Sequence, residues 1–156
     1  MVFRVLAIGK LRDTAIRAAC DDYLGRARRY FRMEVREVTG RPRGTSPAER
    51  RRAEAAALLA GLSPDGTTVA LTRAGRSEDS ARFARRMATW QQAGRDVTFL
   101  IGGAFGLDPT VLARCDARIS LSALTLPHEL ARLVLLEQLY RAATILNGEP
   151  YHKGSA

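Results

Sequence analysis

The stretch "LSALTLPHE", Leu121–Glu129, decides how the last part of this chain folds. It follows an apolar run, alternates small residues with leucines, and then reaches a proline and a histidine. Pro127 suits the first turn of a helix, because its fixed φ is helical and its missing N–H is not needed there. The stretch is therefore predicted to join a strand to a long last helix. Its small side chains and leucines also suit the wall of a binding site.

Strand and helix patterns alternate along the rest of the chain. Short apolar, β-branched runs predict strands, and longer amphipathic segments with cap residues predict helices. The expected strands are 2–8, 34–38, 68–72, 97–101 and 117–121, and the expected helices are 14–31, 46–60, 77–94, 108–114 and 127–146. This alternation predicts an α/β fold with a mostly parallel sheet covered by helices on both faces. The length of 156 residues fits a single domain, residues 1–156.

The last predicted helix is apolar around most of its circumference. A helix that covers one face of a sheet needs only one apolar stripe. This helix is therefore expected to be deeply buried or shared with a second subunit, and we favour a homodimer.

The chain is basic, and the excess charge is placed unevenly. Its net charge is +9, and residues 1–52 carry 14 Arg and Lys against 6 Asp and Glu. The basic clusters include Arg50, Arg51 and Arg52, which are candidates for binding a polyanion such as RNA or DNA. Solvated helix faces in an arginine-rich chain would give the same composition, so both interpretations stay open.

Other features point to the cytoplasm and away from membranes. No apolar run is long enough to cross a bilayer, and the N-terminus lacks the apolar segment of a signal peptide. Cys20 and Cys115 lie far apart and are expected to be reduced thiols. No cluster of His, Cys, Asp or Glu has the spacing of a metal site, so no metal is expected.

Ligands of parallel sheets bind beyond the carboxyl ends of the strands. That edge should carry "TRAGR" (72–76), "GGAFG" (102–106) and "SALTLPHE" (122–129). The glycine-rich segment matches neither a phosphate-binding Walker loop nor a dinucleotide fingerprint, so by itself it could be a simple turn.

Several motifs together resemble the RlmH family of SPOUT-superfamily methyltransferases. They are "IGG-x-x-G" (101–106), "SLSALTLPHELARLVLLEQLYRA" (120–142), "GEPYHK" (148–153) and the N-terminal "VLAIGKLRD" (5–13). The resemblance implies a C-terminal trefoil knot, a homodimer and S-adenosylmethionine as the cofactor. It also implies methylation of N3 of a pseudouridine in 23S ribosomal RNA of the large subunit, so that the partner is ribosomal RNA or the ribosome.

The resemblance also implies a cofactor site in which backbone groups and leucine side chains hold the adenosine. Its expected residues are Leu71, Gly102, Gly103, Gly106, Leu121, Ser122, Ala123, Leu124, Thr125 and Leu126. The chain departs from the family beside this site. Thr72 and Arg73 follow Leu71, where an acidic residue is common.

A base is needed to remove the N3 proton, and histidine titrates near neutral pH. His152 is the first candidate, with Tyr151 and Arg141 positioning the nucleobase, and His128 is the alternative. Arg132 could neutralise charge on the imide or bind phosphate.

Simpler roles remain open at this point. Arg141 could form a helix ion pair with Glu137, His128 could cap or pack at a helix start, and the tail could be a frayed terminus. A SPOUT-like enzyme with another ribosomal or transfer RNA target, or a non-catalytic RNA-binding protein, also remains open.

Overall fold

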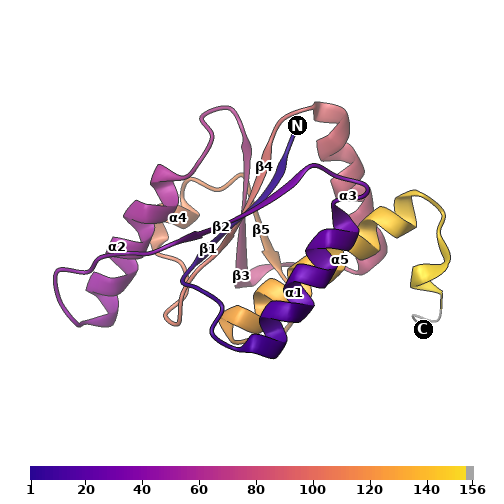
Figure 1. Ribbon diagram of the computed structural model, residues 1–156. Coiled ribbons are helices and arrows are strands. Elements are labelled where there is room, and N and C mark those ends of the chain that lie inside the picture. Colours follow the sequence, from indigo (N-terminus) through magenta and orange to yellow (C-terminus); the bar gives the residue numbers. More distant parts are fainter. Residues whose placement is uncertain (154–156) are drawn as a thin grey trace.

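Five parallel strands form the centre of the computed structural model, which describes residues 1–153 apart from the side chain of His152 (Figure 1). The strand order across the sheet is β2-β1-β4-β3-β5. The strands are β1 Phe3–Ile8, β2 Met33–Val38, β3 Thr67–Ser77, β4 Val97–Ile101 and β5 Ala117–Ser120. This arrangement confirms the predicted α/β class.

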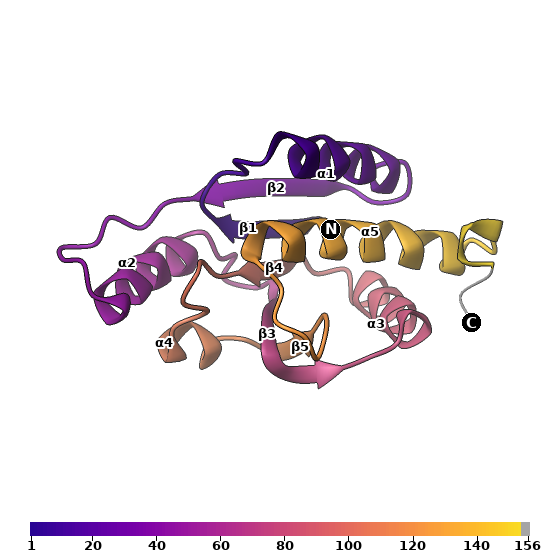
Figure 2. The ribbon, with the colours of Figure 1, turned by 90° about the horizontal axis from the view of Figure 1, so that it is seen from below.

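Helices cover both faces of this sheet (Figures 1 and 2). They are α1 Thr14–Ala27, α2 Pro47–Ala60, α3 Ser80–Ala93, α4 Pro109–Leu112 and α5 His128–Leu146, followed by the short 3₁₀ helix η1 Pro150–His152. Figure 2 shows α1, α5 and α3 on one side and α2 and α4 on the other. The trefoil knot stays a prediction.

Strand β1 contributes side chains to two hydrophobic cores, one on each face of the sheet. All six of its residues are buried, as expected for a strand with helices on both sides. Side chains alternate between the faces, so Val5 packs in the larger core under α1, α3 and α5. Leu6 packs in the smaller core beside Leu58 of α2.

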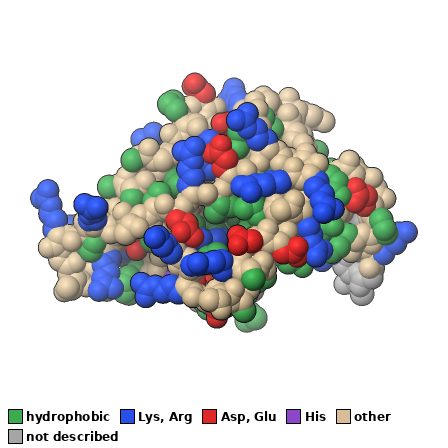
Figure 3. All heavy atoms as spheres, in the orientation of Figure 1, with side chains coloured by type: hydrophobic (Ala, Val, Ile, Leu, Met, Phe, Trp, Pro, Cys, Tyr) green, Lys and Arg blue, Asp and Glu red, His purple; other side chains and the backbone are tan. Residues whose placement is uncertain are grey.

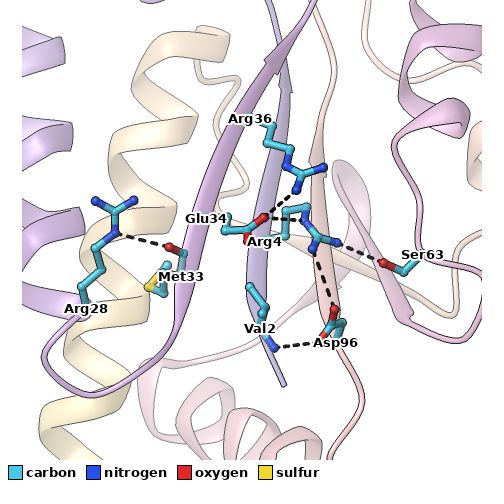
Figure 4. A network of polar contacts seen from close by, with 8 residues as sticks. All are labelled: Val2, Arg4, Arg28, Met33, Glu34, Arg36, Ser63 and Asp96. Atoms are coloured by element: carbon cyan, nitrogen blue, oxygen red, sulfur yellow. Dashed lines mark hydrogen bonds and ion pairs between the residues drawn. The ribbon is translucent and has the colours of Figure 1, made fainter.

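The amino ends of the strands are held together by a buried arginine (Figure 4). Arg4, only 7% exposed, forms ion pairs with Glu34 at 3.2 Å and with Asp96 at 3.8 Å. It also donates a hydrogen bond to Ser63 Oγ at 3.1 Å. Arg4 lowers the pKa of the Glu34 carboxyl, chiefly through their hydrogen bond. These contacts tie β1, β2 and β4 together at the edge opposite the predicted site.

Helix α5 lies between α1 and α3 in Figure 2 and contacts both. Leu135, Leu136 and Leu139 on this helix are almost completely buried within the chain. The apolar circumference that suggested a second subunit is therefore covered in large part by the chain itself.

Three predicted boundaries were wrong by three residues or more. The first helix ends at Ala27 and not at Phe31, because the chain turns there and brings Phe31 back into the core. The third strand was expected to end at Thr72 and a helix to begin at Ser77. Instead, β3 runs to Ser77, and α3 begins at Ser80, capped by Asp79, whose carboxylate accepts a hydrogen bond from the Arg82 N–H at 2.7 Å.

The extra length of β3 comes from an irregularity in its pairing with β5. Both Leu71 and Arg76 pair with Ile119, so the four residues between them leave the ladder. Gly75 makes the return possible, since a Cβ there would lie 2.6 Å from backbone atoms of Ile119. The excursion brings Thr72 and Arg73 to the carboxyl edge of the sheet.

Candidate functional site

A cavity of about 290 Å³ opens at the carboxyl ends of β3 and β5. This is the edge at which parallel sheets bind ligands, and its small size and mixed apolar and hydroxyl lining suit part of a cofactor. Its walls come from the end of β3, the loop after β5 and the first turns of α5. The lining residues are Leu71, Thr72, Arg73, Ser120, Leu121, Ser122, Leu124, Thr125, Leu126 and Ala131.

The loop after β5 is shaped by its own serines. Ser120 Oγ donates to the Ser122 carbonyl at 2.8 Å, and the Leu124 N–H donates to Ser122 Oγ at 2.9 Å. These bonds turn the chain so that Leu124 stands in solvent, with 76% of its surface exposed. Leu124 thus stands beside the cavity with its side chain open to contact.

Arg73 and Thr125 face one another across this cavity from opposite walls. Arg73 Nη1 donates to Thr125 Oγ1 at 2.8 Å. In the sequence, Arg73 stands out only as a departure from the family pattern. Its place beside the loop after β5 depends on the irregularity in β3, which the sequence pattern did not reveal.

The glycine loop follows β4, the strand that neighbours β3. Gly103 and Gly106 pair as an isolated antiparallel bridge, and Gly106 has a φ of 75°. A Cβ on Gly102 would lie 2.8 Å from the carbonyl carbon of Gly106, so the backbone closes on itself too tightly for any side chain.

Six of the ten predicted cofactor residues line the cavity together. They are Leu71, Leu121, Ser122, Leu124, Thr125 and Leu126. The glycine loop and Ala123 are not among its lining residues. Their predicted roles in cofactor binding stay predictions.

Glu54 of α2 packs directly against the glycine loop. Its Oε1 lies 2.6 Å from the position that a Cβ on Gly103 would take, and its Oε2 is buried without a hydrogen-bond partner among the described residues. Burial raises the pKa of the Glu54 carboxyl, opposed by a hydrogen bond from the Gly103 backbone and the charge of His128. Sequence reasoning missed Glu54, because it lies about 50 residues before the glycine loop in the sequence and no motif links the two.

Arg132, which the sequence predicted to contact the substrate, is bonded to other residues of the chain. It is 1% exposed, and its Nη1 lies 2.6 Å from Glu37 Oε1. Its Nη2 donates to the Gly9 carbonyl at 2.8 Å. The guanidinium thus joins α5 to the ends of β1 and β2. His128, half-buried, is the first residue of α5, close enough to Glu54 for their charges to interact.

Arg141 and Tyr151 lie together near the far end of α5. Arg141 forms the i,i+4 ion pair with Glu137 that was one of its two possible roles, at 2.7 Å. Its guanidinium carbon lies 4.8 Å from the centroid of the Tyr151 ring, and the Tyr151 hydroxyl donates to Glu137 at 3.0 Å. Burial and hydrogen bonds to neighbouring groups raise the pKa of Tyr151. The side chain of His152 lies outside the described residues.

A second cavity of about 650 Å³ lies next to the end of β5 and the middle of α5. It runs between α3 and α5 and includes Arg141 and Gln138. It shares Ser120 and Leu121 with the first cavity. The structure thus places Arg141 in a hollow that has two wall residues in common with the first cavity. Tyr151 is not among the residues that line either cavity.

The predicted basic residues of α2 lie away from the cavity. Arg50 and Arg52 are exposed, and Arg51 is half-buried. Lys and Arg side chains gather at the end of the molecule where Figure 1 places α2 (Figure 3).

Within the described part of the chain, no group of three or more His, Cys, Asp and Glu side chains could hold a metal ion. The helices of residues 1–153 also include none long and apolar enough to cross a membrane.

Comparison with known proteins gives the site a context. Residues 1–152 match a family model described as "Predicted SPOUT methyltransferase". A protein of Anaeromyxobacter dehalogenans strain 2CP-1, named ribosomal RNA large subunit methyltransferase H, is 47% identical over 98% of this chain and all of its own length. A protein of the same name from Gemmatimonas aurantiaca is 47% identical over 96% of this chain and 97% of its own.

Solved structures show the same fold at low identity. A probable methylase family protein from Haemophilus influenzae Rd KW20 has a TM-score of 0.52 and 13% identity, with 94% of this chain and 66% of that chain covered. A probable rRNA-methyltransferase from Porphyromonas gingivalis has a TM-score of 0.51 and 14% identity, with 92% and 68% covered.

Proposed function

Since the chain belongs to the SPOUT methyltransferase family, we propose that it transfers a methyl group from S-adenosylmethionine to N3 of a pseudouridine in 23S ribosomal RNA. The observation that carries this proposal is the cavity between Leu71 and the Leu121–Leu126 loop, at the sheet edge where a cofactor is expected. Relatives named as large-subunit ribosomal RNA methyltransferases, 47% identical over nearly the whole chain, support the choice of substrate.

The residues of the cavity fit an adenosine-bearing cofactor. Leu121, Leu124 and Leu126 offer apolar contacts to a purine ring, and the exposure of Leu124 leaves it open to one. Ser122 and backbone groups of the loop offer hydrogen bonds to the ribose and base. When bound, S-adenosylmethionine supplies an activated methyl group, so the protein must mainly align donor and acceptor.

The acceptor nitrogen must lose a proton before or during the transfer. His152 is proposed as the base, because histidine changes its charge near neutral pH. Tyr151 and Arg141 would hold the target nucleobase. Their contact with one another supports a joint role, since a guanidinium stacked on a tyrosine ring is an ordered surface for a flat ligand.

The position of the tail favours a homodimer with a shared site. Helix α5 has 19 residues, so its ends lie about 28 Å apart. The cofactor cavity is beside its first turns, and Tyr151 follows its last. A tail that acts at the cavity would therefore reach it most directly in a second copy of the chain.

Mixing two impaired variants tests this shared site, with S-adenosylmethionine near the wild-type Kd so that Gly102→Ala alone stays largely unloaded. His152→Ala would remove the base and Gly102→Ala would disturb the cofactor loop. If subunits exchange at a 1:1 ratio, half of the dimers are mixed and carry one intact site each, so about a quarter of wild-type activity should return. Absence of recovery, despite subunit exchange shown by native mass spectrometry, would mean that the tail acts within its own chain.

The basic surface of α2 is proposed to bind phosphates of ribosomal RNA. We expect the triple change of Arg50, Arg51 and Arg52 to Glu to weaken RNA binding and to flatten its salt dependence, because fewer counterions are released. The slope of log K against log salt should fall by roughly 1 for each RNA phosphate that the protein no longer neutralises. Changing Arg82, Arg85 and Arg95 of the α3 side to Glu is the charge-matched control. Equal salt slopes in the two triple variants would refute a specific contact between the α2 arginines and RNA.

The proposed reaction is tested directly with ribosomes from a strain that lacks this modification. Purified protein and S-adenosylmethionine should convert one pseudouridine of 23S RNA to its N3-methyl form, detected by nucleoside mass spectrometry. Methylation at another nucleotide, or only of transfer RNA, would refute the proposed substrate. A cytoplasmic location follows from this proposal, because the substrate is ribosomal.

A further inference from the structure

Among the described residues that line the cofactor cavity, Arg73 is the only one with a charged side chain. The others are apolar residues and hydroxyl-bearing Ser and Thr. Arg73 is exposed, and it bonds Thr125 on the other wall at 2.8 Å. A guanidinium has five N–H donors, so the bond to Thr125 leaves others for an anion.

The charges of the proposed cofactor make this position selective. S-adenosylmethionine carries a positive sulfonium, a positive ammonium and one negative carboxylate. A fixed guanidinium at the rim repels the first two and attracts the third. The adenosine has apolar contacts available at Leu121, Leu124 and Leu126 on the wall formed by the β5–α5 loop. An anchored adenosine would leave the charged amino-acid end of the cofactor to be oriented by Arg73.

We propose that Arg73 binds the carboxylate of the methionine moiety and so fixes the direction of the methyl group. This inference rests on the proposed function and extends it to a residue of the Thr72–Arg73 segment, which follows Leu71 where an acidic residue is common in the family. Arg73 can do so with two parallel hydrogen bonds, the geometry that guanidinium and carboxylate share. The Thr125 hydroxyl holds the side chain over the cavity until the ligand arrives.

A phosphate of the RNA substrate offers the same anionic chemistry at the rim. The carboxylate is favoured, because Arg73 is built into the cavity wall beside Thr72 and not into the basic surface over α2. The experiment therefore separates the two anions.

Calorimetry with two ligands and two proteins provides the test. The ligands are S-adenosylmethionine and its decarboxylated form, in which hydrogen replaces the carboxylate. Wild type should bind the decarboxylated ligand about tenfold more weakly. Arg73→Met should bind S-adenosylmethionine about tenfold more weakly and show no further weakening with the decarboxylated ligand. Arg76→Met is the matched control, since Arg76 is an exposed arginine of the same strand outside the cavity, and it should behave as wild type.

Other results would overturn the proposal. If Arg73→Met weakens both ligands equally, Arg73 has no contact with the carboxylate. If it leaves both affinities unchanged but weakens binding of large ribosomal subunits without cofactor, the anion is an RNA phosphate. If wild type binds neither ligand, the proposed methyltransferase function fails, and this inference fails with it. Arg73→Lys, which keeps the charge but not the paired geometry, should recover only part of the affinity.

Discussion

Replacement of Arg132 by methionine is expected to lower the free energy of unfolding by about 3 kcal/mol. Arg132 is fully buried and joins Glu37 and the Gly9 carbonyl. Methionine fills similar space, but it leaves the Gly9 carbonyl without this donor and Glu37 without its charged partner, with only the 3.4 Å hydrogen bond from the Leu11 N–H remaining. The value lies at the low end for a broken buried pair, because the Glu37 side chain keeps 34% exposure and can be partly hydrated. Urea unfolding at neutral pH measures the change.

Arg141 provides the matched control for this prediction. It also pairs with a glutamate, but its side chain is 22% exposed and its partner Glu137 is 18% exposed. Because both charges keep some contact with water, Arg141→Met should cost only about 1 kcal/mol. In a second step, Glu37→Gln added to Arg132→Met should recover part of the stability, since it removes the unpaired carboxylate.

A different result would support the substrate contact that the sequence predicted for Arg132. If Arg132→Met unfolds like wild type but no longer methylates ribosomal RNA, the guanidinium serves the substrate and not the fold. The structure favours the first outcome, because both of its terminal nitrogens are already bonded within the chain.

The strands were predictable where they are short apolar runs between clear breaks, or, as in β2, where apolar and charged residues alternate. β1 and β4 are buried over their whole length and contain almost nothing but apolar residues. The second half of β3, residues 72–77, was not predicted as a strand, because its sequence "TRAGRS" is polar and contains glycine, which is typical of a loop. Its strand conformation comes from pairing with Ile119 of β5, a contact that no local pattern reveals.

The residues of the candidate site were also predictable only in part. Leu71, Leu121 and Leu126 could be placed together, because both segments follow parallel strands and so reach the same edge. The position of Glu54 beside the glycine loop and the pairing of Glu37 with Arg132 could not be predicted, because each depends on how a distant segment packs. A charged residue in a periodic apolar helix gives the same pattern whether it reaches solvent or a buried partner. Burial decides between these roles, and only the packed structure supplies it.

Replacement of Gly102 by alanine is expected to weaken binding of S-adenosylmethionine by roughly 100-fold, which corresponds to about 2.7 kcal/mol of binding free energy. The added Cβ would lie 2.8 Å from the carbonyl carbon of Gly106 and 2.9 Å from its oxygen, both backbone atoms. The loop cannot yield without breaking the Gly103–Gly106 bridge, so its amides and carbonyls would be displaced. Strain should also cost about 1–3 kcal/mol of stability.

Gly25→Ala makes the same chemical change where it should do no harm. Gly25 lies inside α1, and a Cβ there would meet nothing within 4 Å. Alanine favours the helix, so this variant should be more stable by up to about 1 kcal/mol and bind the cofactor like wild type. Calorimetry for binding and urea unfolding for stability compare the two variants. If Gly102→Ala bound S-adenosylmethionine as tightly as Gly25→Ala, the glycine loop would have no part in the cofactor site, and the cavity between Leu71 and Leu126 would have to hold the ligand alone.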